Sequence, residues 1–498
     1  MIIYSSIELL QHPIYGECAI ASKDLRAGDI VIEESPLMTI DYTIDLLLDT
    51  VAKELHYKRK RAFMTLSHPA KVSLSFAQQP QLASMVVASF HLPNTTSSMI
   101  RKSMAYKAAV RGCKELRGRA EMFPEIKSYE DTQLVAFSMI ASANAHAFDT
   151  NSIALLELGC KVTHSCFNPN VAASIRERRG ESSVTSTNGD EIPEQTMKHI
   201  ALVEVRKGDV LFGTYAKLTL QSVPERKSYL RDHKMFKCQC KYCHGLDKAR
   251  GMKCSDCCHE LEKDKKEPPV PLSSMYQRRR PDAAEAWVCN NCTSSTSSEE
   301  LKIALGKNIG SEEIFRKRLQ DLDDVEESPS SRMASFQTLY LLALTAFGWR
   351  HSLTASAALA FMDACSKVID PSVPVTRDEI DLVLSSFETI PDYLEQWFVF
   401  LDIPPIEELA ALYLFSSEQL MTLSSLHHEY IQRSMNIVQT LLLKVRPLIE
   451  QRRTWQIGHV LEEYYDELLQ TLNALVNGST GEEFTESETI EANEKFAV

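Results

Sequence analysis

The sequence lacks an apolar run long enough to cross a membrane. Its strongest apolar stretch, Leu339 to Trp349, is interrupted by Arg350 and His351, well short of the roughly 20 residues that a membrane helix needs. The first residues, MIIYSSIELLQ, contain no basic segment followed by an apolar run, so we expect no secretory signal. The sequence therefore predicts a soluble protein without a membrane partner.

Extremes of composition are also missing. Apolar residues make up 44% and charged residues 24% of the chain, which is ordinary globular usage and excludes a mostly disordered or collagen-like protein. The 498 residues exceed the roughly 250–300 that one core supports, so we expect two large domains and a small one. Because the net charge is −13, we expect no nucleic-acid partner unless residues 58–61 or 278–280 form a local basic patch.

Cysteine, in contrast, is plentiful. There are 13 cysteines, most of them between Cys160 and Cys292 at spacings of one or two residues. Without a secretory signal, this arrangement favours zinc thiolates in a reducing compartment over disulfides. It predicts a cytoplasmic or nuclear protein.

Two groups of cysteines have the spacing of zinc ligands. One group satisfies a four-thiolate structural site by itself and comprises Cys254, Cys257, Cys289 and Cys292, with Cys258 as an alternative ligand. The other is the trio Cys238, Cys240 and Cys243. A structural zinc takes four ligands, so the trio needs a fourth from elsewhere in the chain.

The periodicity of apolar residues changes along the chain. Short strand and turn patterns fill residues 1–42 and return near residues 170–205, whereas helical spacing prevails from about 44 to 142. Residues 311–476 are helical throughout, with breaks at Pro371, Pro391 and Pro404-Pro405, and paired helices of this length are compatible with a tetratricopeptide-like solenoid.

We therefore predict an α+β protein in four parts. A β-rich domain at residues 1–245 contains a helical insertion at about 44–142, and a small four-cysteine zinc module follows at 246–300. A helical, tetratricopeptide-like domain occupies 301–476. The acidic tail at 477–498 is predicted to be disordered.

Four separated segments share their order with a known family. Gly16 to Ala21 resembles G-x-G-x-x-A, and Asn144 to Phe148 places an Asn near an aromatic, although such an Asn is equally a helix cap. Thr163 to Asn170 resembles N-H-S-C-x-P-N. Gly208 to Tyr215 resembles G-E-E-I-x-x-x-Y and is followed by Phe236 and the cysteine trio. Together these segments resemble SET-domain protein-lysine methyltransferases of the SET and MYND branch, over about half of the chain.

The resemblance implies a fold and a set of site residues. The β-rich SET domain would hold the helical insertion and a pseudoknot, followed by a zinc-bound post-SET segment at 236–245 and an all-α C-terminal domain. Cys166 would be the fourth ligand of the trio, and Tyr215 would be the catalytic residue that orients the amine. The implied cofactor-binding residues are Gly16, Glu17, Asn144, Thr163, His164, Tyr215 and Phe236. The branch's MYND finger is missing, because Cys113 is the only cysteine between Cys18 and Cys160.

The implied function is S-adenosylmethionine-dependent N-methylation of a histone or non-histone protein lysine, by a monomer with two structural zinc ions. Four departures favour the alternative of a catalytically inactive SET scaffold for protein partners. They are Cys18 in place of a second glycine, Thr163 in place of Asn, one inserted residue before Pro169, and Lys234 where related enzymes carry a channel-lining Tyr. A third hypothesis, disfavoured by the acidic charge, is a zinc-dependent nucleic-acid binder at residues 246–300.

Overall fold

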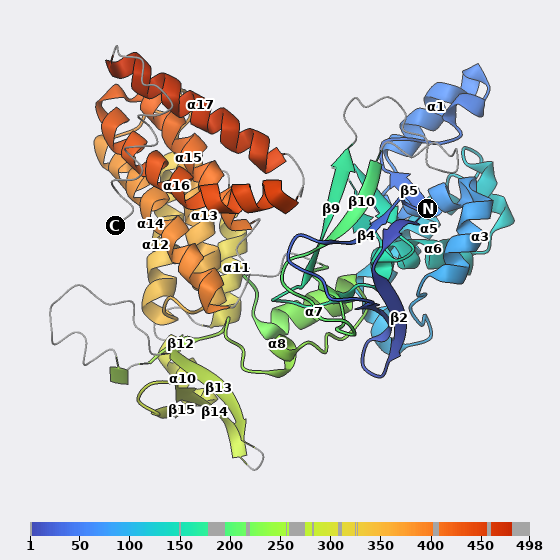
Figure 1. Ribbon diagram of the computed structural model, residues 1–498, viewed down its shortest axis with the longest axis horizontal. Coiled ribbons are helices and arrows are strands. Elements are labelled where there is room, and N and C mark those ends of the chain that lie inside the picture. Colours follow the sequence, from blue (N-terminus) through green and yellow to red (C-terminus); the bar gives the residue numbers. More distant parts are fainter. Residues whose placement is uncertain are drawn as a thin grey trace. The chain divides into compact units, whose positions relative to one another are not determined.

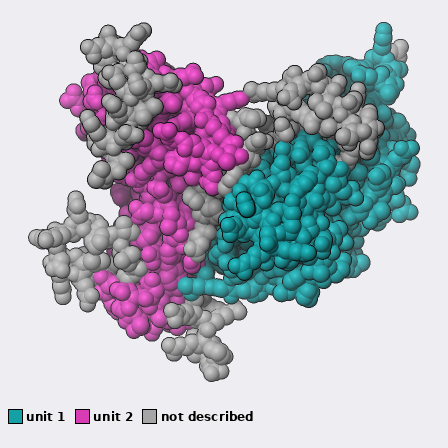
Figure 2. Space-filling model, in the orientation of Figure 1, with its two compact units in different colours: residues 1–247 teal, residues 248–498 magenta. Residues whose placement is uncertain are grey.

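The fold is known from a computed structural model, which describes residues 2–148, 151–177, 195–215, 220–254, 256–257, 274–280, 283–306, 311–323, 325, 327–401, 408–455 and 460–480. The chain divides into two compact units, Met1–Asp247 and Lys248–Val498, which Figure 2 shows in different colours. Each unit has buried apolar clusters of its own.

Small sheets form the β part of the first unit (Figure 1). The largest is antiparallel, in the order β1 (Ile2–Ser5), β4 (Ile30–Glu34), β10 (Gln195–Ala201) and β9 (Val171–Glu177). Two further antiparallel groups are the hairpin β2 (Ile7–His12) and β3 (Gly16–Ala21), and the sheet β5 (Met38–Asp41), β7 (Ser152–Leu155) and β6 (His146–Ala147).

A short parallel pair positions the candidate site. It consists of β8 (Thr163–His164) and β11 (Phe212–Gly213). Buried side chains from β3, β4 and β9 pack with Val162 and Leu211, which directly precede these two strands. The segment Thr163 to Asn170, called the signature segment below, is therefore fixed by the β core on one side.

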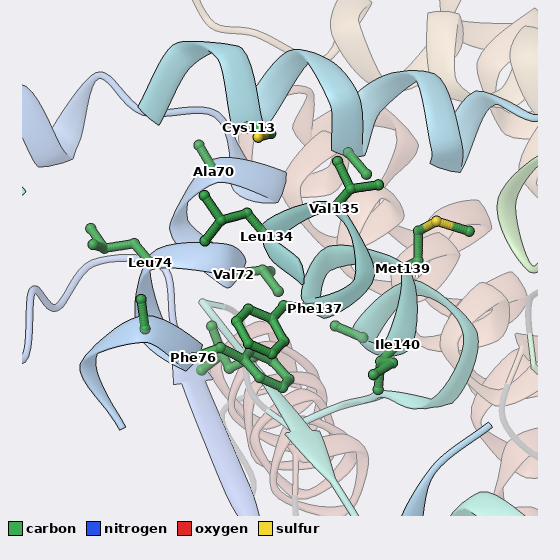
Figure 3. Close-up of a cluster of buried hydrophobic side chains, with 14 of the residues drawn as sticks. Ala70, Val72, Leu74, Phe76, Cys113, Leu134, Val135, Phe137, Met139 and Ile140 are labelled. Atoms are coloured by element: carbon green, nitrogen blue, oxygen red, sulfur yellow. The ribbon is translucent and has the colours of Figure 1, made fainter. Parts of the chain in front are cut away.

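Helices fill the chain between β5 and β6. They are η1 (Leu48–Thr50), α1 (Lys53–Met64), α2 (His68–Gln78), α3 (Pro80–Ser89), α4 (Ser98–Lys102), α5 (Met104–Arg117), η2 (Pro124–Ser128) and α6 (Asp131–Asn144). Every residue of α2 from Ala70 to Ala77 is buried, so α2 lies at the centre of this helical layer. Figure 3 shows Phe76 of α2 against Phe137 of α6, with stacked rings whose centroids are 4.8 Å apart.

Three short helical elements complete the first unit: η3 (Gly159–Lys161), α7 (Val223–His233) and α8 (Lys241–His244). Ser222 and Glu225 form a capping box at the start of α7, which satisfies orphan N–H groups of the first turn. The helix ends where the segment with the cysteine trio begins.

The second unit combines a small sheet with a helical array. The antiparallel sheet has the order β12 (Met252–Lys253), β13 (Ser274–Arg280), β14 (Ala283–Cys289) and β15 (Ser295–Ser297). The helical elements are α10 (Ser298–Gly306), α11 (Glu312–Asp323), α12 (Pro329–Ala346), α13 (Ser352–Val368), α14 (Arg377–Phe400), α15 (Glu408–Leu426), η5 (His428–Tyr430), α16 (Ile431–Trp455) and α17 (Val460–Thr480). From α12 on, each α-helix packs against the next.

The predicted mixture of helices and strands with a helical C-terminal region is confirmed. The predicted break at Pro391 is wrong: this proline lies inside α14, where burial of Ile390, Leu394 and Trp397 offsets the lost backbone hydrogen bond. Helix α17 continues to Thr480, four residues past the predicted end of the helical domain at 476, and the rest of the predicted tail lies outside the described residues. Among the described helices, none has the length and apolarity to cross a bilayer. The pseudoknot, the solenoid and the four-part division stay predictions.

Candidate functional site

Four cysteines from distant parts of the first unit meet at one point. The sulfurs of Cys166, Cys238, Cys240 and Cys243 lie within 4.8 Å of one another, and all four residues are buried. Cys166 follows β8, whereas the trio lies between α7 and the middle of α8. The structure thus brings Cys166 together with the cysteine trio, which by its spacing supplied only three of the four ligands of a structural zinc.

The geometry of this cluster suits a tetrahedral zinc ion. A Zn–S distance of about 2.3 Å in a tetrahedron places sulfurs about 3.8 Å apart. The Cys166 sulfur lies 3.7 Å from the Cys238 sulfur and 3.5 Å from the Cys243 sulfur. The backbone N–H of Cys240 donates to the Cys238 sulfur, which supports a thiolate there.

His164 connects this cluster with Tyr215. Its Nδ1 accepts the backbone N–H of Tyr215 at 3.1 Å, so in the neutral ring the proton belongs on Nε2. Nε2 lies 3.2 Å from the Cys166 sulfur and can donate to it. Burial lowers the pKa of His164 to about 4, so this ring is neutral at pH 7.

The rings of His164, Tyr215 and Phe236 form an aromatic group beside the cysteines. Their centroids are 5.1 Å apart for His164 and Tyr215, 5.7 Å for His164 and Phe236, and 6.0 Å for Tyr215 and Phe236. The Tyr215 hydroxyl donates to the carbonyl of Val162 at 2.6 Å, and burial raises the pKa of Tyr215 well above its usual range. The phenol therefore stays protonated, and its oxygen is left as an acceptor toward any amine placed there.

The N-terminal hairpin also reaches the signature segment. Gly16 has a φ of +70°, which glycine adopts without strain, and the ring of its neighbour Tyr15 meets Phe212 of β11 edge to face. Glu17 pairs with Lys161 at 2.6 Å. Two predicted cofactor residues, Gly16 and Glu17, thus lie on the hairpin that flanks β8 and β11.

The side chains of Cys18 and Thr163 interact with each other, and burial raises the pKa of Cys18. These two departures from the family pattern therefore contact each other. Asn144, another predicted cofactor residue, ends α6, and its amide nitrogen donates to the carbonyls of Ile140 and His91. That half of the amide serves as a helix cap.

Lys234 points into the unit from the end of α7. Its side chain is half-buried, and burial lowers its pKa. Its charge acts on two rings from different strands, His146 of β6 and His164 of β8. The amine therefore lies near His164, one of the residues that the resemblance assigns to cofactor binding.

The sequence did not predict the role of Glu34, whose buried carboxyl fixes the backbone just before the signature segment. The carboxyl of Glu34, on β4, accepts the N–H groups of Leu158 at 3.0 Å and Gly159 at 2.6 Å. The ring of His146 also interacts with the backbone of Gly159. A Cβ on Gly159 would lie 2.6 Å from Cε1 of His199. Glu34, Leu158, Gly159 and His199 belong to no motif, so only the folded chain reveals their contacts.

Two further positioning residues were also missed. Asn170 donates from its amide to the carbonyl of Val210 at 2.9 Å and accepts the N–H of Phe212 at 2.6 Å, which fixes β11 beside β8. Arg226 of α7 is buried, and its guanidinium lies 4.3 Å from the ring centroid of Phe167. Asn170 ends the motif Thr163 to Asn170, for which the sequence predicted no role at this position, and Arg226 lies between Tyr215 and Phe236. Their polar side chains in an apolar setting were the available signal.

The second unit contains another four-cysteine cluster. The sulfurs of Cys254, Cys257, Cys289 and Cys292 lie within 4.8 Å of one another, with separations of 3.6 Å for Cys254 and Cys292 and 3.7 Å for Cys257 and Cys289. Cys292 is exposed, whereas the other three are buried. Three of these cysteines belong to the same apolar core as Phe315 and Phe347, so an ion here would join the small sheet to the helices. Cys258, the alternative ligand, lies outside the described residues.

Comparison with known proteins gives only distant matches. No known family's sequence profile matches the chain, and no curated protein matches its sequence. Solved structures that are similar include the SET domain of LSMT bound to lysine and AdoHcy, with 12% identity, a TM-score of 0.33 and coverage of 99% of this chain and 95% of that one. Rubisco LSMT bound to AdoMet is similar with 11% identity, a TM-score of 0.31 and coverage of 88% and 89%.

Proposed function

We propose that the first unit is an S-adenosylmethionine-dependent protein-lysine N-methyltransferase. The observation that carries this proposal is the meeting of Cys166 with Cys238, Cys240 and Cys243 beside the ring of Tyr215. Motifs far apart in the sequence converge there in the combination that the SET family resemblance implies. A chance resemblance of isolated motifs gives no reason for that convergence.

The residues of the site suit methyl transfer to an amine. When bound, S-adenosylmethionine supplies an electrophilic methyl group, and the acceptor nitrogen must be neutral and in line with it. A lysine with an ordinary pKa of about 10.4 is mostly charged at pH 7, and a buried, aromatic setting disfavours the ammonium form. The Tyr215 hydroxyl donates its proton to the carbonyl of Val162. Its oxygen can therefore accept a hydrogen bond from the substrate amine and orient it. His164 holds the Tyr215 backbone in place.

Zinc is the metal that fits both clusters, and its role is structural. Each cluster offers four thiolates and no open coordination position, which distinguishes a structural zinc from a catalytic one. In the first unit the ion ties the segment after α7 to the signature segment. We further propose that the protein is a monomer in the cytoplasm or nucleus and acts on a histone or non-histone lysine. We also propose that its first unit contains the predicted pseudoknot and that the protein belongs to the SET and MYND branch.

A catalytically inactive scaffold is the competing function. Two observations favour it: the interaction between the side chains of Cys18 and Thr163, and the amine of Lys234 close to His146 and His164. In both cases a side chain that departs from the family pattern lies where the resemblance implies that cofactor or substrate binds. The protonated Tyr215 in its aromatic group favours the enzyme.

The test separates binding from chemistry. S-adenosylmethionine is titrated into the protein by calorimetry, and transfer of labelled methyl groups into a cell extract is then measured. Replacing Tyr215 by Phe should retain binding and reduce transfer by roughly a hundredfold or more, the scale of losing one positioned polar group. Tyr57→Phe, at a ring 72% exposed, is the matched control and should transfer normally. If S-adenosylmethionine does not bind the wild-type protein, the scaffold is the correct function.

A further inference from the structure

The charge of the chain is distributed unevenly. Residues 55–114 contain no Asp or Glu and ten Lys and Arg. This stretch therefore has a net charge of +10, whereas the whole chain has −13 and the remainder −23. The negative net charge of the whole chain therefore does not exclude nucleic-acid binding at this basic stretch, because the local electrostatic field governs such binding.

Most of these cations face solvent. Arg59 and Lys71 are buried and serve internal contacts, with Asp45 and Glu125 for Arg59 and the carbonyl of Tyr42 for Lys71. The other eight are exposed: Lys58, Lys60, Arg61, Arg101, Lys102, Lys107, Arg111 and Lys114. The stretch thus contributes a basic surface and not a set of structural ion pairs.

Three of the exposed cations form a row on α5. Lys107, Arg111 and Lys114 are spaced by four and three residues, which places them on one helix face about 6 and 4.5 Å apart along the axis. The opposite face of α5 buries Cys113 and Leu116. At Gly112 an added Cβ would lie only 2.8 Å from the backbone of Ala70, so α5 packs tightly on α2 with its row outward.

The row continues into a hollow at the start of α5. A cleft of about 490 Å³ is lined by Ser98, Met99, Lys102, Met104, Lys107, Arg231 and Asp232. Its one carboxylate, Asp232, is engaged by Arg231 at 3.1 Å and by Ser228 at 3.0 Å. Glu115, next to the row, accepts from Ser67 and lies 3.6 Å from Arg119. Among the described residues, no carboxylate pairs with Lys102, Lys107, Arg111 or Lys114.

We propose that this cationic row, Lys102, Lys107, Arg111 and Lys114, binds the phosphate backbone of double-stranded DNA without sequence preference. Charge complementarity selects the occupant. Cores of protein–protein interfaces are depleted of Lys and need apolar anchors, whereas protein–DNA interfaces are strongly positive and polar. Exposed cations that run from Lys102 at the end of α4 along one face of α5 match the second kind. This proposal goes beyond the methyltransferase function and does not depend on it.

The test is a salt titration with two triple variants of the full-length protein. Anisotropy of a labelled random-sequence DNA duplex is measured between about 50 and 200 mM salt, the range over which phosphate contacts are strongly screened. The row variant is Lys107→Gln, Arg111→Gln and Lys114→Gln. The control is Lys317→Gln, Arg318→Gln and Lys367→Gln, three exposed cations of the second unit that change the net charge equally. Because all six are exposed, both variants should melt as the wild-type protein does.

The row variant should bind the duplex at least tenfold more weakly. The slope of log affinity against log salt should become shallower by about 2.7, since each lost phosphate contact removes about 0.9. The control should keep the wild-type affinity and slope. The proposal is wrong if the wild-type protein does not bind the duplex at the lowest salt, or if both variants weaken equally. It is also wrong if polyglutamate of equal charge binds the row as tightly as DNA does, because the partner would then be an acidic protein.

Discussion

Replacing Gly159 by alanine tests the contact that holds the signature segment. The new Cβ would lie 2.6 Å from Cε1 of His199, 2.9 Å from Cδ1 of Leu156 and 3.1 Å from Oε1 of Glu34. Such overpacking typically costs about 1–3 kcal/mol, and losing the hydrogen bond between the Gly159 N–H and Glu34 adds about 1 kcal/mol. For a unit of this size, each kcal/mol lowers the melting temperature by about 2–4 °C. We therefore expect the first unit to melt roughly 4–16 °C lower.

The positions of the tryptophans allow the unfolding of the two units to be followed separately. All four tryptophans, Trp287, Trp349, Trp397 and Trp455, lie in residues 248–498. Gly159→Ala should therefore shift a transition seen by far-ultraviolet circular dichroism and leave the transition in tryptophan fluorescence unchanged.

Adding His199→Ala to Gly159→Ala relieves the closest contact. The double variant should be more stable than the sum of the two single losses predicts, by about 1 kcal/mol or more, which is the usual size of coupling between touching residues. The reasoning fails if Gly159→Ala melts like the wild-type protein, or if the two losses are additive.

Three further predictions concern metal, pH and the channel. A chelator should remove metal from the second cluster first, because Cys292 is exposed while the first cluster is wholly buried; metal release should be biphasic, and Trp287 fluorescence should change in the fast phase only. Burial, with the charge of Lys234, lowers the pKa of His146 to about 4, and burial lowers that of His199 to about 3. The folded state thus binds fewer protons than the unfolded state, whose histidines titrate near pH 6.5, so the free energy of unfolding should fall below that pH by about 1.4 kcal/mol per pH unit for each ring. In an acid titration down to about pH 4, His199→Gln should remove the share of one ring from this slope and leave the shares of His146 and His164. An unchanged slope would exclude His199 as a contributor. Lys234→Tyr should raise methyl transfer by about tenfold, because a cation roughly 10 Å from the substrate lysine repels it by about 1–2 kcal/mol at an effective dielectric constant near 20; equal or lower transfer would show that Lys234 does not face the substrate.

Short-range patterns in the sequence predicted the features that are local. Cysteine spacing fixed which residues form each four-sulfur cluster, apart from Cys166, which came from the family resemblance and not from spacing. Helical periodicity indicated the helical layer around α2 and the helices of the second unit. In each case the signal is the spacing of residues along the chain, which can be seen in the sequence without knowledge of the fold.

Features that depend on packing were not predictable. Glu34 and Gly159 are 125 residues apart and carry no motif, so their hydrogen bond exists only once β4 lies behind the signature segment. Pro391 reads as a helix break by propensity, yet the buried face of α14 overrides it. The charge row was hidden for another reason, because residues 58–61 stand out as a run whereas Lys107, Arg111 and Lys114 align only on a helix.

Titration of S-adenosylmethionine into two single-cysteine variants tests the central claim most directly. Cys166→Ser removes one ligand of the cluster beside Tyr215, and Cys292→Ser removes one ligand of the cluster in the second unit, so each should lose one of two zinc ions. The account predicts that Cys292→Ser binds S-adenosylmethionine within about twofold of the wild-type protein, whereas Cys166→Ser loses more than 1.4 kcal/mol of binding free energy, about tenfold in affinity. Unchanged binding by Cys166→Ser would contradict it, because the cluster would then have no part in building the pocket.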